Sequence, residues 1–415
     1  MRPVAPSLAV LTVLALAASA CSSGGSDDGG ADSTAEIAAT TAPVVTEAPE
    51  TTGAPATTSA PETTAAPPAT EVTTPATADS DLDVHDLLEA LASDEMNGRD
   101  NQTPGSLLAQ ELLVAQLSQF AEPAFPDADG DAGYLQPYDV GTNVLAIIPG
   151  AELADEYVMI GAHYDHHGND CGGVGPEDDI CNGATDNAAG VAAAVNIARA
   201  IAADGPPRRS VIITLWDGEE DGLVGANHYV TDPVVPLDQT VAYVNFDIQG
   251  SNLLPSLATS TILVGAETGG ENLVDSARQA TEASTLNTVM LSLLFGQGRS
   301  DHAVLVGAGV PSVFLTDANS GCYHTVEDDI DVVDFAKLDQ QVATAEALSR
   351  DLIATDTPPV FDPDAPTSSY EDAAELLELV AAAEPDFGLL GPEARAASEQ
   401  YLIDLQAIVD AGPAA

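Results

Sequence analysis

Basic side chains are nearly absent from this chain. Its 415 residues contain 66 aspartates and glutamates but only 10 lysines and arginines, so the formal net charge at pH 7 is −56. A surface of this charge repels nucleic acids and anionic membrane faces, which excludes both as electrostatic partners. The charge keeps a protein soluble but identifies no function.

Residues 22–78 almost entirely lack large apolar side chains. They consist mainly of Thr, Ala, Pro, Ser, Gly and acidic residues, and such a segment cannot bury enough apolar surface to fold. We therefore expect a disordered tether, which as a flexible coil of about 57 residues spans on the order of 40 Å.

The segment before the tether has the features of a secretion signal. Residues 1–20 carry Arg2, then an apolar run, and end in Ala18-Ser19-Ala20 directly before Cys21. This ending resembles the lipobox of bacterial lipoproteins, in which the cysteine is acylated and becomes the new N-terminus. The sequence predicts an exported protein, either lipid-anchored through Cys21 at the outer face of the cell membrane or secreted after an ordinary signal-peptide cleavage. The lipid anchor is the only membrane contact that we expect.

Short apolar segments alternate with helical ones between residues 79 and 357. This alternation is typical of a sheet covered by helices on both faces. We expect one α/β domain with three layers, α/β/α, around a central mixed, largely parallel sheet. In residues 358–415 we expect a proline-rich link and a C-terminal helical hairpin, which packs on the domain or on a partner. The expected strands are 144–148, 157–162, 211–216, 241–246, 261–264 and 311–315.

Acidic residues and histidines directly follow several of these strands. The second expected strand is followed by His163 and Asp165, the third by Glu219 and Glu220, and the fourth by Asp247. Because sites in open α/β sheets form at the carboxyl ends of strands, we expect these side chains to converge on one crevice.

Two more residues belong to this pattern. Asp186 lies in a glycine-rich turn before a helix, and His324 follows the last expected strand. Histidines and carboxylates without cysteine suit zinc in a site that stays open to water or substrate. A carboxylate can bridge two zinc ions, and a carboxylate beside the metals can accept a proton from the attacking water.

Five short motifs in the chain resemble those of the co-catalytic zinc aminopeptidases, a family of metallopeptidases that includes bacterial leucyl aminopeptidases and glutamate carboxypeptidases. The resemblance runs from about residue 87 to 353 in the family's motif order. The motifs are Gly161-Ala162-His163-Tyr164-Asp165, Thr185-Asp186-Asn187, Trp216-Asp217-Gly218-Glu219-Glu220-Asp221-Gly222, Asn245-Phe246-Asp247 and Tyr323-His324-Thr325.

The resemblance implies two Zn²⁺ per chain and a ligand for each. His163 and Asp247 are expected to hold one zinc ion, Glu220 and His324 the other, and Asp186 to bridge them.

The remaining roles also follow from the resemblance. Glu219 is expected to be the general base, and Asp165 the carboxylate that orients the His163 ring. Tyr323 is expected to donate a hydrogen bond to the tetrahedral intermediate. We also expect a cis peptide bond at Asp186–Asn187. The implied activity is an extracytoplasmic aminopeptidase that acts on peptides with free N-termini.

Three cysteines remain once Cys21 is assigned to the lipobox. Cys171 and Cys181 flank an acidic, glycine-rich loop, and in an exported protein they are expected to form a disulfide. Cys322 is left either as a buried thiol or as a partner of one of these two.

Other functions remain open at this stage. A carboxypeptidase or dipeptidase of the same fold needs basic residues to bind the terminal carboxylate, and only Arg299 lies near a motif. A non-catalytic, receptor-like relative and a one-zinc acyltransferase resembling glutaminyl cyclase are further alternatives. His166 and His167 are expected to line the crevice or face solvent rather than bind zinc.

Overall fold

The computed structural model describes residues 81–176, 178–296, 299–365 and 369–413. The predicted signal segment, Cys21 and the predicted tether lie outside these residues. No helix among the described residues is long and apolar enough to cross a membrane.

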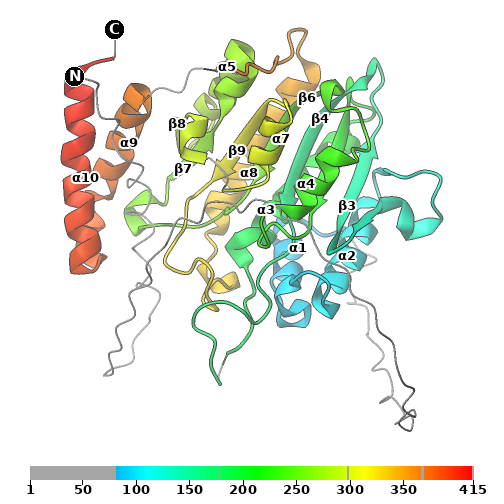
Figure 1. The fold of residues 1–415 in the computed structure, drawn as a ribbon, viewed down its shortest axis with the longest axis horizontal. Helices are drawn as coiled ribbons and strands as arrows, with labels where there is room; N and C mark the ends of the chain where they lie inside the picture. The colour runs from blue at the N-terminus through cyan, green and yellow to red at the C-terminus, as the bar shows by residue number, and fades with distance from the viewer. Residues whose placement is uncertain (1–80, 177, 297–298, 366–368, 414–415) are drawn as a thin grey trace, which may run out of the picture. The chain divides into compact units, whose positions relative to one another are not determined.

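A nine-stranded mixed sheet forms the centre of the fold, in the order β1-β3-β5-β4-β6-β9-β7-β8, with β2 paired to β3 (Figure 1). The central strands β5, β4, β6 and β9 run parallel, whereas β3 joins β5 and β7 joins β9 in antiparallel fashion. The predicted mixed α/β sheet is therefore confirmed. The strands are β1 Glu122–Pro123, β2 Leu135–Tyr138, β3 Gly141–Ile148, β4 Leu153–His163, β5 Arg209–Trp216, β6 Thr240–Phe246, β7 Ser260–Val264, β8 Asn287–Leu291 and β9 Ser312–Thr316.

Helices cover both faces of the sheet because the buried side chains alternate along each strand. In β4, Val158 and Ile160 face one apolar cluster with α1, α2, α3, α5 and α8, whereas Met159 faces another with α4 and α7. Figure 1 shows these two layers on either side of the strands. The helices are α1 Val84–Leu91, α2 Pro104–Leu117, α3 Ala189–Ala203, α4 Val224–Thr231, α5 Gly270–Glu282, α6 Leu293–Gly296, α7 His302–Gly307, α8 Phe335–Ala354, α9 Ser369–Ala383 and α10 Pro392–Ala411.

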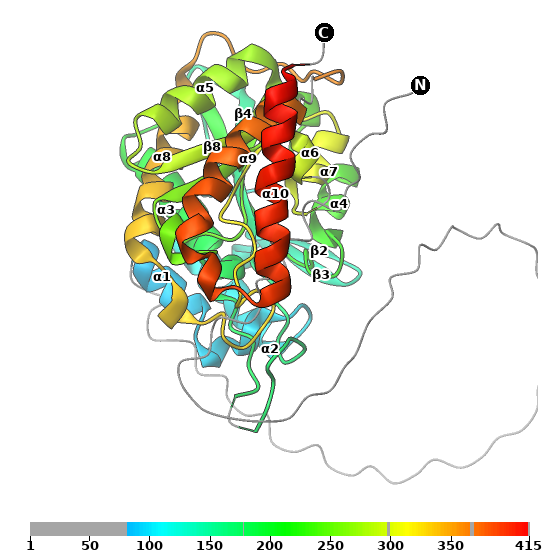
Figure 2. The same cartoon turned by 90° about the vertical axis from the view of Figure 1, so that its left-hand side faces the viewer.

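The C-terminal hairpin, formed by α9 and α10, packs on the domain at the β7–β8 edge of the sheet (Figure 2). The sequence left open whether the hairpin packs on the domain or on a partner, and in the structure it packs on the domain. Apolar side chains of β7 and β8, including Val264 and Leu291, form one buried cluster with Leu376, Leu379 and Tyr401 of the hairpin.

Candidate active site

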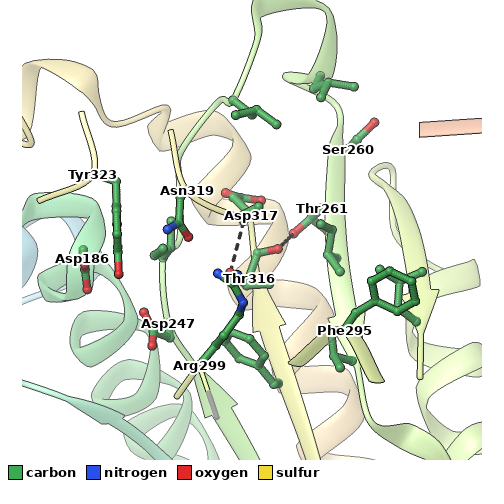
Figure 3. A pocket seen from close by; sticks show the side chains of 18 of the residues that line it. Asp186, Asp247, Ser260, Thr261, Phe295, Arg299, Thr316, Asp317, Asn319 and Tyr323 are labelled. Carbon is green, nitrogen blue, oxygen red and sulfur yellow. Dashed lines mark hydrogen bonds between the residues drawn. The ribbon is translucent and has the colours of Figure 1, made fainter. Parts of the chain in front are cut away.

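A cavity of about 410 Å³ opens at the carboxyl ends of the central strands. Figure 3 shows Asp186, Asp247 and Tyr323 at one side of it, and Thr261 and Phe295 at the other. The predicted site residues that line this cavity are Asp186, Glu219, Glu220, Asp247, Tyr323 and His324.

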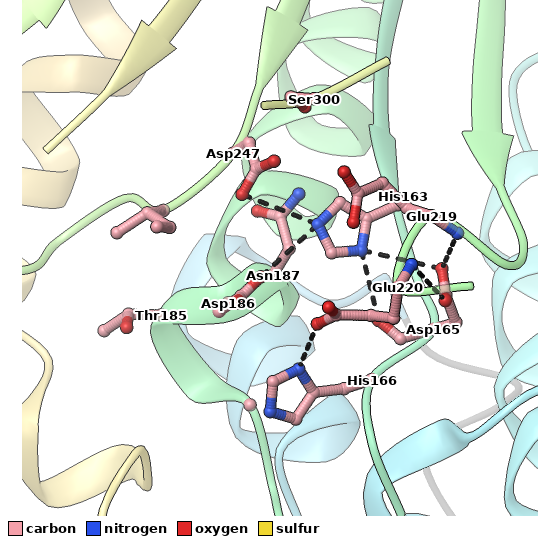
Figure 4. Close-up of polar contacts among 12 residues, drawn as sticks. His163, Asp165, His166, Thr185, Asp186, Asn187, Glu219, Glu220, Asp247 and Ser300 are labelled. Atoms are coloured by element: carbon pink, nitrogen blue, oxygen red, sulfur yellow. Dashed lines mark hydrogen bonds and ion pairs between the residues drawn. The ribbon is translucent and has the colours of Figure 1, made fainter. Parts of the chain in front are cut away.

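Three of the predicted ligands meet where β4 and β6 end. His163, the last residue of β4, is buried, and its Nε2 lies 3.3 Å from Asp186 Oδ1 and 3.5 Å from Asp247 Oδ1 (Figure 4). The Nε2 atom has no hydrogen-bond partner among the described residues. Oxygens of Asp186 and Asp247 therefore both lie within 3.5 Å of one histidine nitrogen, and His163, Asp186 and Glu220 form a group that could hold a metal ion.

The other predicted ligands form a second group. His324 Nε2 lies 3.3 Å from Asp186 Oδ2 and 3.2 Å from Glu220 Oε2. This nitrogen also lacks a hydrogen-bond partner among the described residues. The two oxygens of Asp186 thus face different histidines, as a bridging carboxylate requires.

The separations between the histidine nitrogens and the carboxylate oxygens fit zinc. Ligands at about 2.0–2.1 Å from a tetrahedral zinc ion are separated from one another by about 3.3–3.4 Å, and the observed separations are 3.2 to 3.5 Å. Burying the His163 and His324 Nε2 atoms without a hydrogen-bond partner costs free energy, unless a metal ion binds them together with the carboxylates. The donor set therefore fits the two zinc ions implied by the resemblance.

The backbone before α3 gives Asp186 its bridging position. The peptide bond Asp186–Asn187 is cis, which confirms the prediction. Gly183 has φ +56°, and a Cβ on it would lie 2.2 Å from the Asp186 carbonyl oxygen, so only glycine fits there. The Asn187 side chain donates a 2.8 Å hydrogen bond to the carbonyl of Phe246, next to the ligand Asp247.

Asp165 connects the ends of β4 and β5. Its carboxylate accepts hydrogen bonds from the backbone N–H of Glu219 (3.1 Å) and of Glu220 (3.2 Å). The Nδ1 atom of His163 lies 3.1 Å from the Asp165 carbonyl and 3.5 Å from its carboxylate. Asp165 thereby fixes the His163 ring and also the loop that carries both glutamates.

The pKa values of Glu219 and Glu220 are shifted in opposite directions. Burial, together with the charges of Asp247 and Asp301, raises the pKa of Glu219 well above its usual value. In contrast, hydrogen bonds from three histidines hold the pKa of Glu220 well below its usual value despite burial. A carboxylate of high pKa suits a proton acceptor, and one of low pKa suits a ligand.

His166 and His167 make contacts that the sequence did not indicate. His166 Nδ1 lies 2.8 Å from Glu220 Oε1, and His167 Nε2 lies 3.1 Å from Glu220 Oε2. His167 Nε2 is also 3.1 Å from His324 Nδ1. His167, Glu220 and His324 thus form a group that could itself hold a metal ion, and His166 is buried rather than exposed.

A disulfide joins Cys171 to Cys181, as expected. Cys322 therefore pairs with neither of them, and none of the described cysteines is a free thiol, so both expectations for Cys322 are wrong. The loop between them contacts the chain around His324, since Gly172 N donates to the His324 carbonyl at 2.8 Å. The disulfide thus closes a loop that supports one of the expected ligands.

Arg99 is a site residue that the sequence analysis missed. It is fully buried and donates hydrogen bonds to four carbonyls, those of Leu91 (2.6 Å), Tyr164 (2.8 Å), Asn182 (2.7 Å) and Gly183 (3.1 Å). Burial lowers its pKa to about 10, so it stays charged at neutral pH. It ties the end of β4 to the loop that leads into Asp186.

Replacing Arg99 with Lys is expected to lower the free energy of unfolding by about 3 kcal/mol, because an ammonium group has three donors and cannot reach four carbonyls in the guanidinium geometry. Urea denaturation of the zinc-bound protein measures this loss. The matched control is Arg395→Lys, whose side chain is 54% exposed. Equal stability of the two variants would contradict the role assigned to Arg99.

Asp328 is the second residue that was missed. Its buried carboxylate accepts hydrogen bonds from Thr185 N (3.0 Å), Thr185 Oγ1 (2.7 Å) and Asp186 N (3.0 Å). It therefore sets the orientation of the bridging residue without approaching the ligand atoms as a ligand itself.

The variant Asp328→Asn is expected to bind zinc about 10- to 100-fold more weakly, since an amide can accept only part of these three hydrogen bonds. Competition with a zinc chelator measures the affinity. The control is Asp331→Asn, which changes an exposed acid on the same segment. Unchanged affinity in Asp328→Asn would rule out its positioning role.

Comparisons with known proteins show what the chain is similar to. The model of Peptidase family M28 matches residues 143–349. A probable glutamate carboxypeptidase of Zea mays is 36% identical over 115 residues, which is 26% of this chain and 14% of that protein. An aminopeptidase of Mus musculus is 34% identical over 113 residues, or 26% of this chain and 13% of its own length. The alignments thus span about one seventh of these relatives.

Two solved structures share the fold at low sequence identity. A leucine aminopeptidase precursor from Bacteroides thetaiotaomicron has a TM-score of 0.52 and 16% identity, covering 66% of this chain and 98% of its own. Glutaminyl cyclase from Porphyromonas gingivalis has a TM-score of 0.51 and 18% identity, covering 65% and 96%. The fold therefore does not distinguish peptidase from cyclase. Residues 143–349, about half of the chain, belong to Peptidase family M28.

Proposed function

We propose that this protein is an extracytoplasmic aminopeptidase that removes N-terminal residues from peptides, with two zinc ions in its active site. The observation that carries the proposal is the position of Asp186, whose two carboxylate oxygens lie 3.3 Å from His163 Nε2 and 3.3 Å from His324 Nε2. His163 and Asp247 would hold one zinc ion, Glu220 and His324 the other, and Asp186 both.

The zinc ions would lower the pKa of the attacking water and polarise the scissile carbonyl. Glu219 would accept the proton of that water and pass it to the leaving amine, a role that its raised pKa supports. Tyr323 lies at the cavity, and burial raises its pKa further, so its hydroxyl stays protonated. It would donate a hydrogen bond to the oxygen that becomes negative.

The charges at the cavity favour a free amine over a carboxylate in the substrate. Five carboxylates line it, and its cationic side chains other than histidine, among the described residues, are Arg299 and Lys337. Lys337 Nζ lies 2.9 Å from Asp317 Oδ1, so its charge is already paired. Arg299 is the observation that favours the alternative, a carboxypeptidase or dipeptidase of the same fold.

Export and lipid anchoring are also part of the proposal. They rest on the signal-like residues 1–20 and on Cys21. The disulfide between Cys171 and Cys181 supports an oxidising compartment. The expected partners are peptides with free N-termini, and the acidic surface disfavours nucleic acid.

The test compares leucine p-nitroanilide with its N-acetylated analogue, with an N-blocked peptide that ends in glutamate and with a peptide that begins with glutamine, using the purified zinc-bound protein. Cleavage of the free-amine compound alone supports the proposal. Faster cleavage of the N-blocked acidic peptide favours the carboxypeptidase. Cyclisation of an N-terminal glutamine without hydrolysis indicates the acyltransferase, and no turnover with zinc bound indicates the receptor-like alternative.

A further inference from the structure

The C-terminal hairpin is attached to the domain by apolar packing and by two polar anchors. Asp372 of α9 accepts hydrogen bonds from Ser292 N (2.8 Å) and Ser292 Oγ (2.6 Å), just after β8. Asp386, in the turn between the helices, accepts one from Ser256 N (2.5 Å). Asp372 is buried. These contacts hold α9 at a defined position rather than loosely against the sheet edge (Figure 2).

This docking brings hairpin side chains to the active-site cavity. Leu376 and Leu379 of α9 and Tyr401 of α10 line the same cavity as Asp186 and Glu219. All three hairpin side chains are at least 94% buried, so they belong to the wall of the cavity. The match to the M28 family ends at residue 349, and the hairpin is therefore an addition to the matched domain.

The part of the cavity near the hairpin is apolar. Phe295 and Phe314 lie there together with Val264 and Leu291 of β7 and β8. Figure 3 shows Phe295 across the cavity from Asp186, on the side away from the expected zinc ligands. A volume of about 410 Å³ is in the range of pockets that enclose a small ligand. An apolar side chain placed there would be removed from water.

We propose that the hairpin forms the far wall of the pocket for the substrate's N-terminal side chain, and that Leu376, Leu379 and Tyr401 select large apolar side chains. The inference rests on the proposed aminopeptidase function and adds the part of the chain that determines specificity. A leucine or phenylalanine side chain contacts this wall, whereas an alanine side chain is too short to reach it. The hairpin therefore affects the two kinds of substrate differently.

The test measures kcat/KM for the p-nitroanilides of leucine, phenylalanine and alanine. Leu379→Ala is expected to lower kcat/KM for leucine about 10-fold, since one or more methylene contacts are lost in an apolar pocket, and to change that for alanine less than about 2-fold. Leu379→Phe narrows the pocket and is expected to lower kcat/KM for phenylalanine more than for alanine.

The matched control is Val380→Ala. Val380 is buried in the same hairpin cluster but does not line the active-site cavity, so its truncation is expected to leave the ratio of leucine to alanine within about 2-fold of wild type. The inference about the hairpin is overturned if Leu379→Ala lowers kcat/KM equally for the leucine and alanine compounds. It is also overturned if Val380→Ala changes the leucine-to-alanine ratio as much as Leu379→Ala does. Neither result affects the proposed aminopeptidase function. A wild-type enzyme that cleaves none of the three compounds overturns the proposed function as well.

Discussion

The variant Glu219→Gln is expected to lower kcat for leucine p-nitroanilide about 1,000-fold while zinc binding stays intact. An amide of the same shape cannot accept the proton of the attacking water. The oxygens and nitrogens that surround the two expected zinc positions belong to other residues, so the metals are expected to remain. Steady-state kinetics and the zinc content per chain, determined on the same sample, check both parts.

The control for this variant is Glu111→Gln, which makes the same chemical change at an exposed position on α2. It is expected to retain wild-type kcat. If Glu219→Gln kept more than a tenth of the wild-type kcat, the proton acceptor would have to be another group. If it lost zinc together with activity, Glu219 would be a ligand rather than the base.

Replacing Asp186 with Asn is expected to remove at least one zinc ion per chain and to reduce hydrolysis to the background rate. The carboxylate has one oxygen directed at each histidine, and an amide offers a single oxygen and a nitrogen that carries hydrogens. The amide side chain of Asp186→Asn could therefore bind only one of the two zinc ions. Zinc content and anomalous scattering at the zinc edge measure the loss.

Asp127→Asn serves as the control, since this acid is exposed in the loop before β2. It is expected to bind zinc as the wild type does. Two fully occupied zinc ions in Asp186→Asn would show that this residue does not bridge the metals, and the assignment of the site would have to change.

Much of the site could be predicted because its ligands directly follow strands or lie in short motifs. His163 is the last residue of β4, and Asp247 directly follows β6. Because β4 and β6 are parallel neighbours in the sheet, the convergence of the two side chains follows from topology alone. The same reasoning explains why the alternation of strands and helices predicted the α/β layers. The short strand β8, Asn287–Leu291, was not predicted, since five residues of mixed character carry little periodicity.

The residues that support the ligands could not be predicted in this way. Arg99 acts through four backbone carbonyls, and every residue has a carbonyl, so the sequence contains no sign of which ones come together. Asp328 follows His324 by four residues and has the sequence context of an ordinary acidic turn. His166 was expected to line the crevice or to face solvent, but tertiary packing buries it and brings its Nδ1 atom to 2.8 Å from Glu220 Oε1.

The docking of the C-terminal hairpin could not be predicted from the sequence either. Its two helices were expected from the sequence, but the surface that they cover was not. The partner surface consists of side chains from β7, β8 and the loop around Leu257, which are far away in the sequence. Its contribution to the active-site cavity follows only from the folded chain.

The central claim is that two zinc ions bridged by Asp186 hydrolyse peptides at free N-termini. Its most direct test is a titration of the metal-free protein with zinc while leucine p-nitroanilide hydrolysis is followed. The account predicts no activity without zinc and maximal activity at two zinc ions per chain. Maximal activity at one zinc ion per chain, or no hydrolysis with two bound, would contradict it.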